Sequence, residues 1–122
     1  MKALLSIKPE FVSKIFEGKK RFEYRRSIFK RPVNLVVVYA SSPVCKVVGE
    51  FEVVELISDD IDELWRKTKK QAGISKDYFY SYFWDKAEGH AIKIGDIKKY
   101  KRPLPLKESF GVAPPQSYLY LL

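Results

Sequence analysis

Three charged side chains within one short stretch have the types and spacing for ligand binding: Lys20, Glu23 and Arg25. In an extended strand successive side chains turn to opposite faces, so Glu23 and Arg25 share one face and the aromatic residues beside them take the other. Arginine presents a planar fork of donors that suits phosphate, and a carboxylate among cations stays ionised at neutral pH. We therefore expect these residues, with Lys8 entering from the first turn, to line an anion-binding cleft.

The same stretch has a simpler interpretation. A charged strand is often only a solvated face, and an exposed ion pair there contributes about 0–1 kcal/mol. If the residues form a site, the Glu23 carboxylate orients the cations, accepts a donor from the edge of a base, or acts as a general base. The residues alone leave these roles open.

Charge is segregated along this basic chain, which has a formal net charge of +8. Residues 14–31 carry eight bases and two acids, and residues 50–63 carry seven acids and no base. Residues 64–76 and 98–107 each carry five bases and no acid. A basic surface favours a polyanionic partner, because lysine and arginine release counterions from a phosphate backbone. Two alternatives stay open: the basicity reflects a basic proteome or a high working temperature, and the acidic segment binds another protein.

Most other motifs that carry chemistry are absent from the sequence. His90 and Cys45 are the only histidine and cysteine, so the common zinc sites and an intramolecular disulfide are not expected. The glycine-rich phosphate and dinucleotide motifs and the serine nucleophile elbow do not occur. We therefore expect no metal and no cofactor. The lone thiol, the lack of a signal-peptide pattern and the lack of a long apolar run favour a cytoplasmic protein without membrane contact.

The elements that must position the charged residues mix strands with short helices, which predicts an α+β fold. A strand over residues 1–7 precedes a helix that begins at Pro9 and stops at Gly18, and the charged strand follows over residues 20–26. Further strands are predicted over residues 35–40, 46–57, 91–94, 97–100 and 118–122. Two valine pairs break the alternation within residues 46–57 and predict either a bulge or burial on both faces there.

Two later helices have start signals in the sequence. Asp59 or Asp60 can cap the first, and Asp60 with Glu63 has the spacing of a capping box. Ser75 can cap the second, after Gly73 has ended the first. The second helix carries an aromatic stripe over residues 78–83, which we interpret as core rather than as a surface that stacks on bases.

The spacing Gly18-x-Lys20-x-x-Glu23-x-Arg25 resembles the G-x-K-x-x-E-x-R signature of the activating-signal-cointegrator homology (ASCH) domain, a member of the PUA-like superfamily. The segments at residues 5–9 and 15–18 and the ending at residues 114–118 are also similar to that family. The resemblance implies one domain over residues 1–122. It also implies a small β-barrel of about five to seven strands with two to three peripheral helices.

The resemblance further implies an RNA- or nucleotide-binding module of RNA metabolism, transcription or translation. Lys20, Glu23 and Arg25 would contact the ligand, and Gly18 would permit the tight entry into the strand. Polar groups expected to read a base or ribose are those of Ser41, Ser42 and Gln116, and the rings expected to stack are those of Tyr24 or Tyr39. Protein partners are left open.

The family also contains enzymes, which gives the alternative function. One branch hydrolyses acetylated cytidine, and nuclease activity is attributed to another. The amidohydrolases have a threonine where Glu23 stands, so their hydroxyl nucleophile is missing here. The alternative is a small hydrolase of a modified nucleoside or RNA, with Lys20 and Glu23 catalytic: Glu23 activates water, and Lys20 or Arg25 stabilises an oxyanion.

Overall fold

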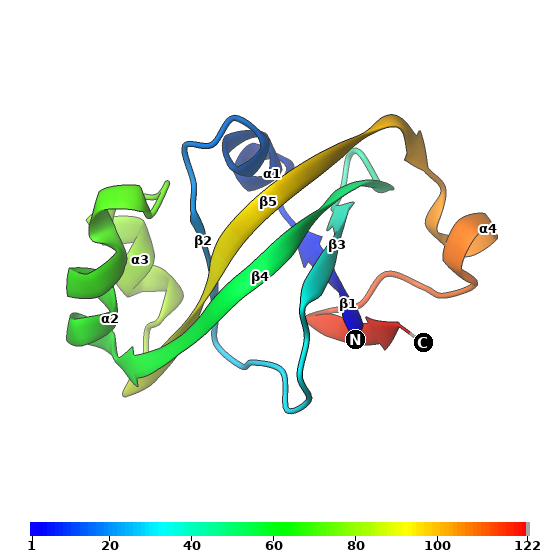
Figure 1. Ribbon diagram of the computed structural model, residues 1–122. Coiled ribbons are helices and arrows are strands. Elements are labelled where there is room, and N and C mark those ends of the chain that lie inside the picture. The colour runs from blue at the N-terminus through cyan, green and yellow to red at the C-terminus, as the bar shows by residue number, and fades with distance from the viewer. Residues whose placement is uncertain (122) are drawn as a thin grey trace.

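Six strands form one mixed sheet in the computed structural model, which describes residues 1–121 (Figure 1). The strands are β1 (Lys2–Ile7), β2 (Phe22–Arg25), β3 (Leu35–Ala40), β4 (Lys46–Asp60), β5 (Glu88–Leu104) and β6 (Tyr118–Leu121). Their order is β2-β5-β4-β3-β1-β6, and only β1 and β3 run parallel. Leu122, the last residue of the strand predicted over 118–122, lies outside the described residues.

The helices are α1 (Pro9–Phe16), α2 (Ile61–Thr68), α3 (Lys76–Tyr82) and α4 (Leu106–Phe110), with a short 3-10 turn, η1 (Lys69–Gln71), after α2. Both predicted caps form. The Asp60 side chain accepts from the Glu63 N–H at 3.0 Å, and Ser75 Oγ accepts from the Tyr78 N–H at 3.1 Å. The sequence did not predict α4, because its prolines indicated only a connection, whereas Pro105 precedes the helix as its N-cap.

The α+β class and the number of strands are confirmed, but the sheet is open and not closed into a barrel. Its two edges are β2 and β6. Arg25, on β2, spans the gap: its Nη2 donates to the carbonyl oxygen of Ser117 at 2.9 Å and to its Oγ at 3.2 Å. Phe29, in the loop after β2, packs edge-on against Tyr118 of β6 at 5.0 Å between ring centres. The Arg25 side chain and the loop after β2 therefore connect the two edges where a closed barrel would have backbone hydrogen bonds between strands.

Two long strands, β4 and β5, cross the sheet and extend beyond it toward α2 (Figure 1). The strands predicted over residues 91–94 and 97–100 are parts of one strand, β5. The predicted irregularity of β4 is confirmed, since its pairing with β5 shifts around Val48, Glu52 and Val54. Such bulges increase the local twist of a strand pair.

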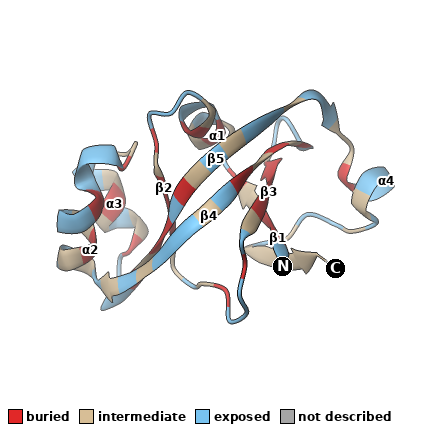
Figure 2. Ribbon diagram, viewed as in Figure 1, coloured by how far each residue is buried: buried red, intermediate tan, exposed pale blue. Residues whose placement is uncertain are grey.

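The buried residues form clusters on opposite faces of the sheet, and Figure 2 shows them along the middle of the strands. Phe22 and Tyr24 pack with α2 and α3, around Leu64 and Phe79. Glu23 turns away from this cluster, as strand alternation predicted. Among the described residues, every helix is too short or too polar to cross a membrane.

Candidate functional site

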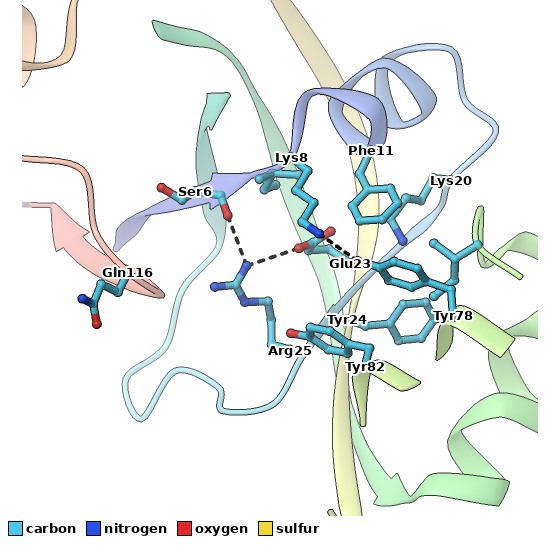
Figure 3. Close-up of a pocket in the computed structure, with 12 residues that line it drawn as sticks. Ser6, Lys8, Phe11, Lys20, Glu23, Tyr24, Arg25, Tyr78, Tyr82 and Gln116 are labelled. Atoms are coloured by element: carbon cyan, nitrogen blue, oxygen red, sulfur yellow. Dashed lines mark hydrogen bonds and ion pairs between the residues drawn. The ribbon is translucent and has the colours of Figure 1, made fainter. Parts of the chain in front are cut away.

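A pocket of about 250 Å³ opens between β2, the turn from β1 into α1, and α3 (Figure 3). Four of the predicted charged residues line it together: Lys8, Lys20, Glu23 and Arg25. Its other walls are mainly aromatic and come from Phe11, Tyr24, Tyr78 and Tyr82, with Gln116 at one end. A small concave pocket with apolar walls and a few convergent polar groups is the usual form of a ligand site.

The Glu23 carboxylate lies at the floor of this pocket with only 7% of its side chain exposed. Its Oε2 accepts from Arg25 Nη1 at 3.3 Å, and no other group among the described residues donates to it. All fully buried polar side-chain atoms in residues 1–121 have partners, so Oε1 is reached from the pocket. A carboxylate oxygen that faces a mainly apolar pocket and has no protein donor favours a hydrogen-bond donor from a ligand.

The Arg25 guanidinium donates hydrogen bonds to three other residues of the protein. Besides its bonds to Glu23 and Ser117, its Nη1 approaches the carbonyl oxygen of Ser6 at 3.4 Å (Figure 3). Only 12% of its side chain is exposed. The fork that the sequence predicted for phosphate is therefore already used, and Arg25 holds the Glu23 carboxylate in place.

Lys20 is the most deeply buried charged residue of the site, at 1% exposure. Its Nζ donates to the carbonyl oxygen of Ala72 at 3.0 Å and lies 5.3 Å from the ring centre of Phe11. Burial lowers the pKa of Lys20 to about 8, against the opposing effect of Glu23, and the nearby charge of Lys14 lowers it further. Lys20 is thus a partly deprotonated amine in mildly alkaline solution, enclosed by aromatic rings.

Lys8 is the exposed cation of the pocket. Its Nζ lies 3.3 Å from the Tyr78 hydroxyl oxygen and 5.7 Å from the centre of that ring. The Tyr78 ring packs edge-on against Phe11 at 5.3 Å. Lys8 and Tyr78 therefore meet at the edge of the pocket, where an anionic ligand group can replace the hydroxyl as the partner of the lysine (Figure 3).

The aromatic walls differ from the prediction. Tyr24 lines the pocket, but its ring packs edge-on against Phe79 and its hydroxyl donates to Thr68 Oγ1 at 2.7 Å. Burial raises the pKa of Tyr24 to about 12. The sequence analysis missed Tyr78 and Tyr82, which line the pocket from one face of α3. The sequence did contain a signal for these two residues. They lie four positions apart, on one face of a helix, and both carry hydroxyls, which the phenylalanines of the same stripe lack.

Four of the predicted residues do not line this pocket. Tyr39 points to the opposite face of the sheet and is buried there with Leu106, because alternation along β3 places it on that side. Gly18 forms the turn from α1 toward β2 with a φ of 77°.

Ser41 and Ser42 belong to the turn between β3 and β4. Val44 of the turn and Phe16 of α1 line a separate hollow, whereas Phe11 of α1 lines the pocket. Neither serine lines the pocket, although the Ser41 N–H donates at 3.0 Å to the carbonyl oxygen of Ile7, which does line it.

Comparison with known proteins gives matches over nearly the whole chain. The ASCH domain profile matches residues 5–104. The chain is 31% identical over 120 residues to ATP synthase subunit alpha of Ureaplasma parvum serovar 3, covering 97% of this chain and 15% of that protein. It is 31% identical over 119 residues to the large ribosomal subunit protein uL22 of the same organism, covering 97% of this chain and 38% of that protein. The chain thus spans a minor part of these two relatives.

A relative of similar length comes from Zymomonas mobilis. The ASCH domain-containing ribonuclease of that organism is 29% identical over 124 residues, covering 98% of this chain and 83% of that protein. A crystal structure of ASCH from Zymomonas mobilis superposes with a TM-score of 0.91 at 30% identity, covering 99% of this chain and 87% of that one. A mutant of the same protein gives 0.91 at 29% identity, with 99% and 90% covered.

Proposed function

The chain belongs to the ASCH domain family, and on this premise we propose that its pocket binds one nucleotide of a single-stranded RNA. The observation that carries the proposal is the buried Glu23 carboxylate, whose Oε1 faces the pocket without a donor. The likeness to a protein named an ASCH domain-containing ribonuclease supports an RNA-related function. The net charge of +8 is in keeping with a polyanionic ligand.

Each wall of the pocket has a role in this proposal. Glu23 Oε1 accepts a hydrogen bond from the exocyclic amino group of a base, and Arg25 fixes the carboxylate for it. Tyr78 and Tyr82 pack against the base, as aromatic side chains do in single-strand recognition. Lys8 binds a phosphate oxygen at the mouth. The pocket, at about 250 Å³, lies just below the roughly 300–1,000 Å³ of common drug-sized sites, so it suits one unstacked base and not a duplex.

The test is a calorimetric titration with the four ribonucleoside monophosphates and with a short single-stranded RNA. We expect the protein to prefer bases that carry an amino group over uracil. Glu23→Gln should reduce this preference, because the amide presents a donor as well as an acceptor. Glu55→Gln is the matched control, since Glu55 is exposed on β4 and has no ion pair among the described residues. An unmodified protein that binds none of these ligands overturns the proposal.

A second candidate function is hydrolysis of RNA or of a modified nucleoside at the same pocket. The observation that favours it is the lowered pKa of Lys20, about 8, beside a carboxylate with a free oxygen. In this candidate Glu23 takes a proton from the attacking hydroxyl or water, and Lys20 stabilises the negative charge that forms. The test is incubation with single-stranded RNA and with acylated nucleosides. Turnover that is absent, or equal in Glu23→Gln, Lys20→Met and unmodified protein, contradicts it.

A further inference from the structure

We propose that three lysines beside the pocket bind the phosphate backbone of the RNA on one side of the bound nucleotide. These are Lys14 on α1 and Lys69 and Lys70 on η1, here called the lysine ridge. The inference rests on the proposed function, and it adds the path that the strand takes across the surface. The ligand is thus a single-stranded RNA longer than the one nucleotide that the pocket holds.

The lysine ridge adjoins the pocket on two elements. Lys14 Nζ donates to the carbonyl oxygen of Gly73 at 3.1 Å, next to the carbonyl of Ala72 that accepts from Lys20. These carbonyls belong to the segment that links η1 to α3, and the following residue, Ile74, lines the pocket. Phe11, about one turn before Lys14 on α1, lines it as well. An RNA strand that leaves the pocket between α1 and the segment linking η1 to α3 therefore meets the lysine ridge first.

The charges of the ridge are not neutralised within the protein. All three lysines are exposed, and none has a carboxylate oxygen within 4.0 Å among residues 1–121. Nearby Lys19 and Lys67, in contrast, form ion pairs with Glu17 and Asp59.

Clustered like charges repel one another, and binding of a polyanion relieves that repulsion. The ridge therefore has three cations without a carboxylate partner, of which Lys14 donates to a carbonyl oxygen, whereas Lys19 and Lys67 are already paired with acids.

A second basic segment, at the loop between β2 and β3, offers a competing path. There the Lys30 and Arg31 N–H groups approach the Tyr120 hydroxyl at 2.8 and 3.2 Å, and the Arg31 guanidinium lies 5.3 Å from the centre of the Tyr120 ring. Neither Lys30 nor Arg31 has a carboxylate oxygen within 4.0 Å among the described residues, so this loop has two unneutralised cations against three on the ridge. The geometry favours the ridge.

The experiment measures how the affinity for a single-stranded RNA of about eight nucleotides depends on salt. Each phosphate contact adds about 0.7 to the slope of log K against log salt for a single strand, so Lys69→Ala/Lys70→Ala should reduce the slope by about 1.4. The matched control is Lys101→Ala/Arg102→Ala, which removes two exposed cations near the far end of β5 (Figure 1). The salt dependence of RNA binding is also measured for the variant Lys30→Ala/Arg31→Ala.

The ridge variant should keep the unmodified affinity for nucleoside monophosphates, because these ligands do not extend beyond the pocket. An unchanged slope in the ridge variant overturns the inference, as does an equal decrease in the Lys101/Arg102 control. A slope that falls only in the Lys30/Arg31 variant would show that the RNA follows the loop between β2 and β3, which also overturns the inference. If the unmodified protein binds monophosphates and RNA normally in any of these cases, the proposed function stands and only the path is wrong.

Discussion

The buried ammonium of Lys20 lies 4.8 Å from the centre of the Tyr24 ring, on the strand that carries the pocket carboxylate. Removing an ammonium from water is costly, and three contacts offset part of the cost: this ring, the Ala72 carbonyl and the charge of Glu23. Lys20 thereby ties β2 to the segment that links η1 to α3. Its position fits a residue that shapes the pocket wall more than one that reaches out to a phosphate.

The pH dependence of stability should reveal this burial. Lys20 has a pKa of about 8 in the folded protein against 10.5 for a free lysine, so between these values the unfolded chain binds the proton more strongly. The Lys20 contribution to the free energy of unfolding therefore increases as the pH rises from about 8 to about 10.5. Urea denaturation of unmodified protein and of Lys20→Met should show a difference in stability that grows in favour of the unmodified protein over this range. A difference that does not vary with pH would contradict it.

Two glycines with nearly the same backbone conformation provide a matched test of the wall around Lys20. Gly73 and Gly18 have φ values of 70° and 77°. A Cβ at Gly73 would lie 2.6 Å from Cγ and 2.9 Å from Cα of Lys20, whereas a Cβ at Gly18 would have nothing within 4 Å. Gly18→Ala should cost about 1–2 kcal/mol from the left-handed conformation alone. Gly73→Ala should cost about 1–3 kcal/mol more from overpacking.

Thermal or chemical denaturation of both alanine variants gives these two values. Equal destabilisation by the two substitutions would mean that the segment from Ala72 to Ile74 moves freely away from β2, and that Lys20 is not held as described.

The sequence predicted the face of β2 on which the Glu23 carboxylate lies, because that prediction depends only on neighbouring residues in the chain. Strand alternation put Glu23 and Arg25 on one face, and side-chain spacing identified Asp60 and Ser75 as helix caps. It did not foresee that Arg25 is occupied, since its partner Ser117 lies 92 positions away in the sequence. Contacts of that range depend on how the edges of the sheet meet, which no local pattern specifies.

The pocket's aromatic wall escaped prediction for a related reason. A stripe of aromatic residues at helical spacing predicts that every residue of the stripe is buried in the core, and Phe79 is indeed fully buried. Only the packing of α3 beside β2 and α1 exposes Tyr78 and Tyr82 to the pocket. Tyr39, in contrast, was expected at the site and lies in the core instead, because an aromatic residue at a strand end can face either side of the sheet.

The tyrosines of the site should separate structural from binding roles. Tyr24→Phe removes a buried hydroxyl that donates to Thr68 Oγ1, so it should destabilise the fold by about 1 kcal/mol. Tyr78→Phe removes a hydroxyl whose contact is with the exposed Lys8, so its effect on stability should be within about 0.5 kcal/mol. Urea denaturation measures both. If Tyr78→Phe proves the more destabilising change, the assignment of a structural role to Tyr24 and a binding role to Tyr78 is wrong.

The two lysines of the pocket should differ in their effect on RNA binding. Lys8 is exposed at the mouth, whereas Lys20 is buried and bound to Ala72, so only Lys8 is free to displace a counterion. Lys8→Ala should therefore lower the salt slope of RNA binding by about 0.7, the value for one phosphate contact. Lys20→Met should leave the slope unchanged and act on affinity only through the shape of the pocket. The sequence alone had predicted that Lys20 lines an anion-binding cleft, and a slope that falls with Lys20→Met but not with Lys8→Ala would support an anion contact by Lys20.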